Sequence, residues 1–144
     1  MKDYIIITDF CLKARNRGTA ALGYGAISFL REKGYIDSNT KIVSYHIHWS
    51  PFCKSHEYSI KVQGQPTKFK DIHINMFEYQ IFNKLGVAIP FLPLGRMLKR
   101  LKCVAAINGG DGFSDIYGKA LYDSRNNEAK MAMKVGTPLI ILPQ

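Results

Sequence analysis

The chain has 144 residues, of which 47% are hydrophobic, 22% charged and 12% aromatic, and this is the size and composition of one globular domain. That composition excludes a disordered or low-complexity protein. A formal charge of +9 raises the question of an anionic partner, but the basic residues fall into three separate groups without a nucleic-acid motif, so no nucleic-acid partner is expected.

The chain opens with a predicted strand and helix. Residues 4–8 are continuously apolar and mostly β-branched, which is typical of a buried parallel strand. A polar, basic loop follows, and a helix is expected over 19–33 with Gly34 as its stop. The apolar residues expected to share its inner face are Leu22, Ala26, Phe29 and Leu30. Together these segments predict the first unit of an open α/β sheet.

The middle of the chain is less regular. A second strand is expected over 41–47, linked to the first by a right-handed crossover through the helix. Residues 48–74 hold two prolines, a glycine and scattered charges, and we interpret them as a loop or an irregular insertion. Short helices are expected over 75–85 and 92–101, the second with Arg96, Lys99 and Arg100 on its solvent side.

The last third returns to the α/β pattern. A buried strand is expected over 103–107, a helix over 120–135 closed by Gly136, and a final strand over 138–142. We therefore predict one Rossmann-like domain over 1–144, with an open parallel sheet and helices on both faces. Because a buried strand with no covering helix ends the chain, we also expect that this domain is truncated and that a second domain is missing.

Targeting and metal-binding patterns are weak. No segment approaches the ~20 consecutive apolar residues that cross a bilayer, and the first apolar run is too short for a signal peptide. Cys11, Cys53 and Cys103 are odd in number and far apart, which indicates neither disulfides nor a zinc site. His46 and His48 would share one face of a strand, but a polar strand end explains them better than a metal site. We expect a cytoplasmic protein with no transmembrane segment and no metal.

A first candidate site precedes the first helix. Asn16, Arg17, Gly18 and Thr19 combine a glycine that lets a ligand approach the backbone with amides at a helix start and basic side chains nearby. The pattern suits an anionic ligand, and it is explained equally well if Asn16 and Thr19 cap the helix while Gly18 makes the turn. The G-x-G-x-x-G dinucleotide fingerprint and the Walker A motif are both missing, and no cofactor is expected.

A second candidate site follows the strand over 103–107. Three glycines within four positions, including Gly109 and Gly110, weaken folding unless the backbone needs unusual dihedrals or a close approach, so we favour a ligand-facing role. Asp111 or Asp115 could hydrogen-bond a sugar hydroxyl or transfer a proton, and Ser114 could bind an oxyanion. Alternatively, the aspartates cap turns or the next helix.

Three motifs occur in order along the chain. They read Asn-Arg-Gly-Thr-Ala-Ala-Leu at 16–22, Ile-Asn-Gly-Gly-Asp-Gly-Phe-Ser-Asp at 107–115 and Gly-Thr-Pro-Leu-Ile-Ile-Leu-Pro-Gln at 136–144. This ordered combination resembles the polysaccharide pyruvyl transferase family, and it is more specific than any one motif. Two positions depart from the family pattern: Thr19 stands where an acidic residue is common, and Asp111 stands where a third glycine is common.

The resemblance implies an enzyme that transfers a pyruvyl group from phosphoenolpyruvate to sugar hydroxyls of a polysaccharide or glycan as a ketal. It implies a two-domain fold like that of GT-B glycosyltransferases, with the donor held largely by the second domain. This chain would then supply the acceptor side of the cleft and would be inactive alone. The candidate catalytic residues are Asp111 and Asp115. The candidate substrate-binding residues are Asn16, Arg17, Gly18, Thr19, Gly109, Gly110 and Ser114.

Two other interpretations stay open. One is the amino-terminal half of a nucleotide-sugar glycosyltransferase, because the same fold class hosts that chemistry. The other is a non-catalytic basic module that binds an anion or a polyanion, for which steeply salt-dependent binding would be the evidence.

Overall fold

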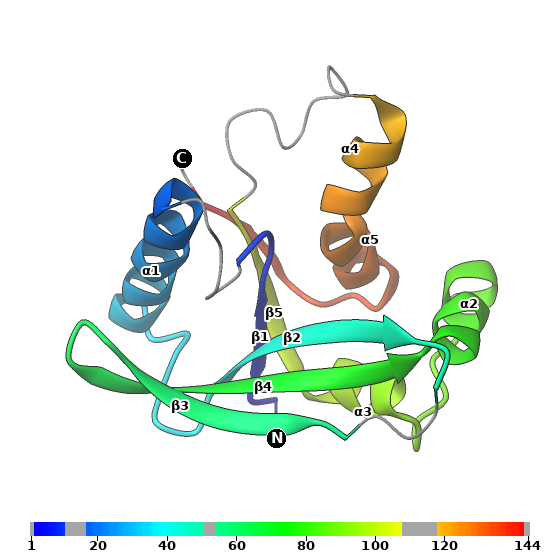
Figure 1. Ribbon diagram of the computed structural model, residues 1–144, viewed down its shortest axis with the longest axis horizontal. Helices are drawn as coiled ribbons and strands as arrows, with labels where there is room; N and C mark the ends of the chain where they lie inside the picture. Colours follow the sequence, from blue (N-terminus) through cyan, green and yellow to red (C-terminus); the bar gives the residue numbers. More distant parts are fainter. Residues whose placement is uncertain (1, 11–16, 51–53, 108–117, 143–144) are drawn as a thin grey trace.

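The computed structural model describes residues 2–10, 17–50, 54–107 and 118–142, which form a six-stranded sheet in the order β3-β4-β2-β1-β5-β6 (Figure 1). The strands are β1 (Tyr4–Ile7), β2 (Lys41–His48), β3 (His56–Val62), β4 (Gln65–Asn75), β5 (Leu101–Ala106) and β6 (Leu139–Ile141). Neighbouring strands are parallel except for β3 and β4, which are antiparallel. The predicted α/β class is confirmed, but the sheet is mixed, whereas a purely parallel one was expected.

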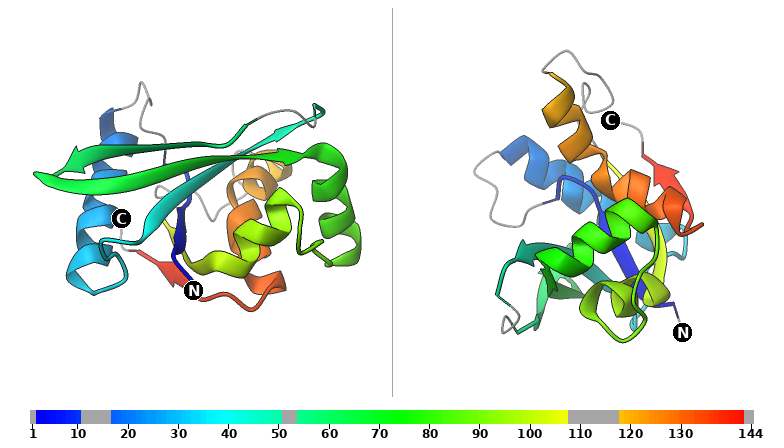
Figure 2. Two further views of the ribbon diagram at one scale, coloured as in Figure 1. Left: turned by 90° about the horizontal axis from the view of Figure 1, so that it is seen from below. Right: turned by 90° about the vertical axis from the view of Figure 1, so that its right-hand side faces the viewer.

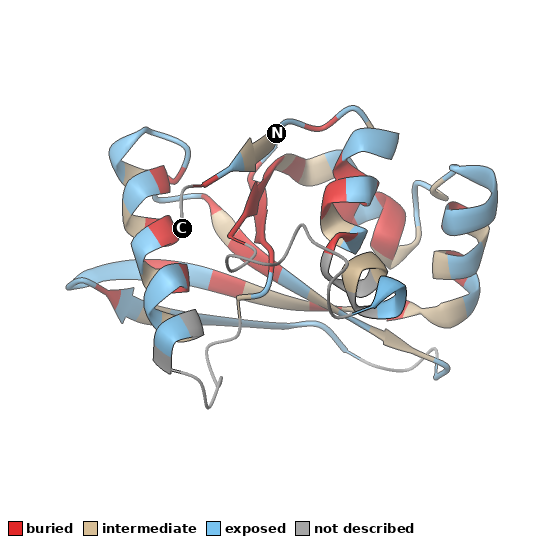
Figure 3. Cartoon of the chain, turned by 90° about the horizontal axis from the view of Figure 1, so that it is seen from above, coloured by how far each residue is buried: buried red, intermediate tan, exposed pale blue. Residues whose placement is uncertain are grey.

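Helices cover both faces of the sheet (Figure 2). They are α1 (Arg17–Glu32), α2 (Met76–Leu85), α3 (Pro93–Arg100), α4 (Lys119–Arg125) and α5 (Asn127–Lys134). One apolar cluster packs α1 on its face, and a second cluster packs α2, α3 and α5 on the other. Burial is densest along the central strands β1 and β5 (Figure 3). The continuous apolar runs of these two strands are explained by burial on both faces.

The inner face of α1 is rotated from the expected one. Leu22 and Phe29 are 40% and 38% exposed, so the prediction is wrong for these two residues. The residues that are buried along the helix are Gly23, Ala26, Ile27 and Leu30. Gly23 belongs to this buried face because the ring of Phe10 lies against the helix backbone at that position.

Residues 48–74 correct a second prediction, because most of them form a hairpin where a loop or irregular insertion was expected. Strands β3 and β4 pair from His56 opposite Asp71 to Val62 opposite Gln65. The turn is Gln63-Gly64, with φ values of 51° and 78°, and a two-residue turn with two positive φ angles matches the twist of a hairpin. The strand pattern was missed because β3 is mostly exposed and has little apolar alternation.

The remaining helices follow the predictions in part. α2 begins after Asn75, whose side chain accepts the N–H of Phe77, and ends at Gly86 with φ 70°. The single helix expected over 120–135 is instead two helices, broken at Asn126 with φ −99° and ψ 7°. The Asn126 side chain donates to the Tyr122 carbonyl at 2.8 Å, a local bond of the kind with which asparagine competes with helix formation.

Candidate functional site

The two predicted site loops leave the sheet at one point. β1 and β5 are parallel neighbours, and open α/β sheets bind ligands beyond the carboxyl ends of such strands. Thr8 is buried at this junction. Its N–H donates to the Ala105 carbonyl at 2.9 Å, and its hydroxyl oxygen accepts the N–H of Ile107 at 3.2 Å. Both loops therefore start from a fixed, hydrogen-bonded position.

The predicted residues of the first loop lie partly in a helix. Arg17, Gly18 and Thr19 form the first turn of α1, a turn that contains no acidic residue. The backbone amides and the positive dipole end of this turn suit an anion. Outside the described residues lie Asn16 and, within 108–117, Gly109, Gly110, Asp111, Ser114 and Asp115. Their roles stay predictions.

Phe10 fixes the start of the first loop against α1. Its ring lies 6.0 Å from that of Tyr24 in an edge-on arrangement and 6.2 Å from that of Phe69 on β4. A Cβ on Gly23 would lie 1.9 Å from the Phe10 ring, so this close approach requires glycine. The sequence analysis considered Gly18 and overlooked Gly23, which no motif marks.

Glu128 brings a partly buried carboxyl group to the same edge of the sheet. Burial raises the pKa of Glu128, and the negative charge of Asp9, just after β1, raises it further. Tyr45, on β2, lies near this carboxylate, and burial followed by the charge of Glu128 raises the tyrosine pKa. A carboxylic acid that keeps its proton closer to neutral pH is suited to general acid catalysis.

Sequence analysis did not identify Asp9, Tyr45 or Glu128. Asp9 carries a usable signal, because it directly follows a buried strand at the sheet edge where ligands bind. Tyr45 and Glu128 carry none. They lie on different elements far apart in the chain, and their pairing depends on how α5 packs over the sheet.

All four histidines of the chain gather on one face of β2, β3 and β4. His46 and His73 stand opposite each other in register, with ring centroids 5.6 Å apart, and the His48 ring lies 4.7 Å from that of His73. The shared face predicted for His46 and His48 is confirmed, with their rings 6.3 Å apart. Burial, followed by the charges of neighbouring histidines, lowers the pKa of His73.

Two negative findings apply to residues 2–10, 17–50, 54–107 and 118–142. Among them, no three His, Cys, Asp or Glu side chains are arranged to hold a metal ion. Within the same ranges, no helix combines the length and the apolarity needed to cross a bilayer.

Comparison with known protein families, with characterised proteins and with solved structures finds no match to this chain. Its function must therefore be inferred from its own residues.

Proposed function

We propose that this chain is the acceptor-binding domain of a polysaccharide pyruvyl transferase, which moves a pyruvyl group from phosphoenolpyruvate to a saccharide. The observation that supports this best is the position of the two glycine-rich motifs. One motif follows β1 and the other follows β5, and these strands are parallel neighbours. Loops at adjacent carboxyl ends are where an open α/β sheet binds its ligand.

The reaction requires proton transfer and stabilisation of negative charge. A sugar hydroxyl adds to C2 of the enol phosphate and loses its proton, while the methylene carbon of phosphoenolpyruvate takes up a proton to become a methyl group. The bond between C2 and the phosphate oxygen then breaks, inorganic phosphate leaves, and a second sugar hydroxyl bonds to C2 and loses its proton, which completes the ketal. Glu128 is a candidate proton donor because burial raises its pKa. The first turn of α1 offers an anion the positive end of a helix dipole.

The proposal assigns the saccharide acceptor to the loop that follows β5. Asp111 and Asp115 would contact acceptor hydroxyls, with Ser114 beside them. The resemblance implies that residues holding the phosphate of the donor come largely from a second domain, so no turnover is expected from this chain alone.

The test is release of inorganic phosphate from phosphoenolpyruvate by the full-length gene product, measured with and without a panel of bacterial-type saccharides. We expect release that depends on the acceptor, and a product that carries one pyruvate ketal in its mass spectrum. Transfer from a uridine or guanosine diphosphate sugar would overturn the proposal in favour of a glycosyltransferase. Acceptor-independent release, or no release with any acceptor, would also count against it.

Variants separate the proposed roles. Asp111→Asn with Asp115→Asn should weaken acceptor use, whereas Glu128→Gln should lower kcat more than it raises KM, because a proton donor acts in the transition state. Tyr45→Phe removes only a hydroxyl that interacts with Glu128, so a smaller loss is expected. If the double asparagine variant keeps full acceptor affinity and turnover, the assignment of the second loop is wrong.

A further inference from the structure

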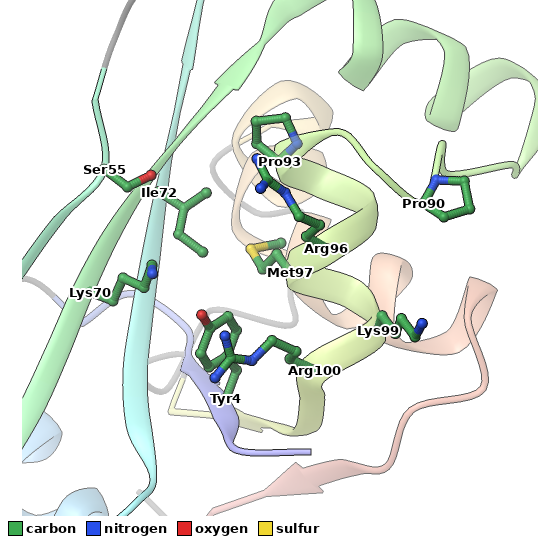
Figure 4. A pocket seen from close by; sticks show the side chains of 10 residues that line it. All are labelled: Tyr4, Ser55, Lys70, Ile72, Pro90, Pro93, Arg96, Met97, Lys99 and Arg100. Carbon is green, nitrogen blue, oxygen red and sulfur yellow. The ribbon is translucent and has the colours of Figure 1, made fainter. Parts of the chain in front are cut away.

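A cavity of about 730 Å³ lies between α3 and the sheet, beside the first residue of β1 and away from the strand ends that lead to the predicted loops (Figure 4). Its volume is typical of small-molecule sites, which span ~300–1,000 Å³. Its polar lining residues are Tyr4, Ser55, Lys70, Arg96, Lys99 and Arg100. Ile72 and Met97 contribute an apolar wall.

The lining is strongly cationic. Four basic side chains line the cavity, and no carboxylate of the described residues does. Two of the four are held by carboxylates outside the lining. Glu57 lies 2.6 Å from the Lys70 amine, and Asp3 pairs with the Arg100 guanidinium.

The other two basic groups have no carboxylate in direct contact among the described residues, although Arg96 interacts at longer range with Glu78. Arg96 and Lys99 are exposed, and neither forms an ion pair with any described residue. They lie three positions apart on α3, which places them on adjacent parts of one helix surface. The cavity therefore keeps an excess of positive charge that a bound anion would neutralise.

Part of the cationic lining is held in a fixed geometry. The Arg100 guanidinium lies 4.2 Å from the centroid of the Tyr4 ring, and the Lys70 amine lies 5.8 Å from it. Figure 4 shows Lys70 and Arg100 reaching toward this ring from β4 and α3. Ion pairs hold Lys70 and Arg100 in position, and the Tyr4 ring beside them is buried. An anion that binds here therefore meets donors that are already in place.

We propose that this cavity binds a small organic phosphate, with the phosphoryl group at Lys70, Arg96 and Arg100 and the uncharged part against Ile72 and Met97. The Arg96 guanidinium can match phosphate oxygens through paired hydrogen bonds, whereas Arg100, two of whose nitrogens bind Asp3, and Lys70 add positive charge. The apolar wall gives a ligand with an organic part an advantage over a bare anion. The inference does not rest on the transferase proposal, because the cavity and the motif-bearing strand ends are different places.

The experiment is a ¹H-¹⁵N NMR titration of the 144-residue chain with three probes: inorganic phosphate, glucose 6-phosphate and glucose. We expect saturable shifts at the backbone amides of Ser55, Lys70, Arg96 and Lys99 with glucose 6-phosphate. Affinity for glucose 6-phosphate should exceed that for inorganic phosphate by about tenfold, and glucose should cause no saturable shift at these amides. Equal affinity for glucose 6-phosphate and inorganic phosphate would overturn the assignment to an organic phosphate.

A matched pair of double variants tests the location. Arg96→Gln with Lys99→Gln removes the two charges of the cavity that form no ion pair with a described residue, and affinity should fall about tenfold or more. Lys33→Gln with Lys84→Gln removes the same net charge from exposed positions outside the lining, and affinity should be retained. An equal loss in both double variants would show general charge attraction and overturn the site. Absence of any saturable shift in the unchanged chain would do the same.

Discussion

Gly95 lets α3 lie against the loop that precedes it. A Cβ at this position would lie 2.0 Å from the Ile89 carbonyl oxygen and 2.6 Å from the carbonyl carbon. Because both are backbone atoms, an added methyl group forces the loop and the helix apart. Gly95→Ala should lower the free energy of unfolding by about 1–3 kcal/mol, measured by urea denaturation.

Gly25 provides the control for that substitution. It also lies in a helix, but a Cβ there would meet nothing within 4 Å. Gly25→Ala should be neutral or stabilising by up to about 1 kcal/mol, because alanine is the better helix former. If the two alanine variants lose equal stability, close packing at Gly95 is not the cause.

The lowered pKa of His73 links stability to pH. In the unfolded chain this histidine takes up a proton near its ordinary pKa of 6.5, whereas in the folded chain a lower pH is needed. Between those two values the unfolded state holds more protons, so stability falls as pH drops through this window. Well above 6.5 the histidine is neutral in both states and contributes no pH dependence.

His73→Gln should therefore reduce the loss of stability between neutral and mildly acidic pH. The measurement is a set of urea unfolding curves on either side of pH 6.5. Lys61→Gln is the control, because Lys61 is exposed on the same hairpin and lies opposite Pro66, away from the histidines. An unchanged pH slope in the His73 variant would show that other groups set the acid sensitivity.

At the scale of secondary structure, predictability follows the strength of the local signal. β1 and β5 were predicted because continuous apolar runs mark strands that are buried on both faces. α2 was predicted close to its observed bounds, and the structure shows that Asn75 at its start and Gly86 after its end serve as caps. The β3–β4 hairpin was not predicted, because β3 lies at the sheet edge with most side chains exposed.

The position of α3 depends on a contact that has no sequence signal. Glu78 of α2 is buried, and its Oε1 accepts the N–H groups of Leu94 and Gly95 at 2.8 and 3.2 Å. These are amides of the first turn of α3, which have no partner within the helix itself. Burial raises the pKa of Glu78, although these two hydrogen bonds oppose the shift.

Glu78→Gln should keep the bond to α3 and remove the buried charge, so stability at neutral pH should stay close to that of the unchanged chain. Glu78→Ala should lose about 1–3 kcal/mol, because buried amides lose their acceptor. The folded pKa lies above the ordinary 4.5, so the unchanged chain should lose stability relative to the glutamine variant as pH rises through that window. Equal losses in both variants, measured by thermal unfolding, would contradict this account.

At the scale of the whole molecule, the class of fold followed from the order of segments, but the strand order did not. Alternating buried strands and helices predict an open sheet. The order depends on pairings such as β1 with β5, which lie far apart in the chain. The candidate site was likewise predictable only in part. Its loops were found by their glycines, whereas Thr8 and Glu128 act through partners that only the fold brings together.

Asp3 and Arg100 join the start of the chain to the end of α3. The Arg100 Nε donates to Asp3 Oδ1 at 2.8 Å, a second guanidinium nitrogen binds Oδ2, and the Asp3 N–H donates to the Arg100 carbonyl at 3.0 Å. The Asp3 carbonyl also accepts the N–H of Lys41 at 2.8 Å. The hydrogen bond from Arg100 lowers the pKa of the Asp3 carboxyl group.

Asp3→Asn should cost roughly 1–2 kcal/mol at neutral pH, a modest value because the Arg100 side chain is 43% exposed to solvent. The stabilisation by the ionised Asp3 carboxylate is fully present above its ordinary pKa of 3.8. It is lost as pH falls through the lower pKa that Asp3 has in the folded chain. Asp123→Asn is the control, since its pair with Lys130 is exposed and local, and it should cost clearly less than Asp3→Asn. Urea unfolding of both variants decides the matter, because equal losses would mean that the contact between Asp3 and Arg100 does not hold the start of the chain against the end of α3.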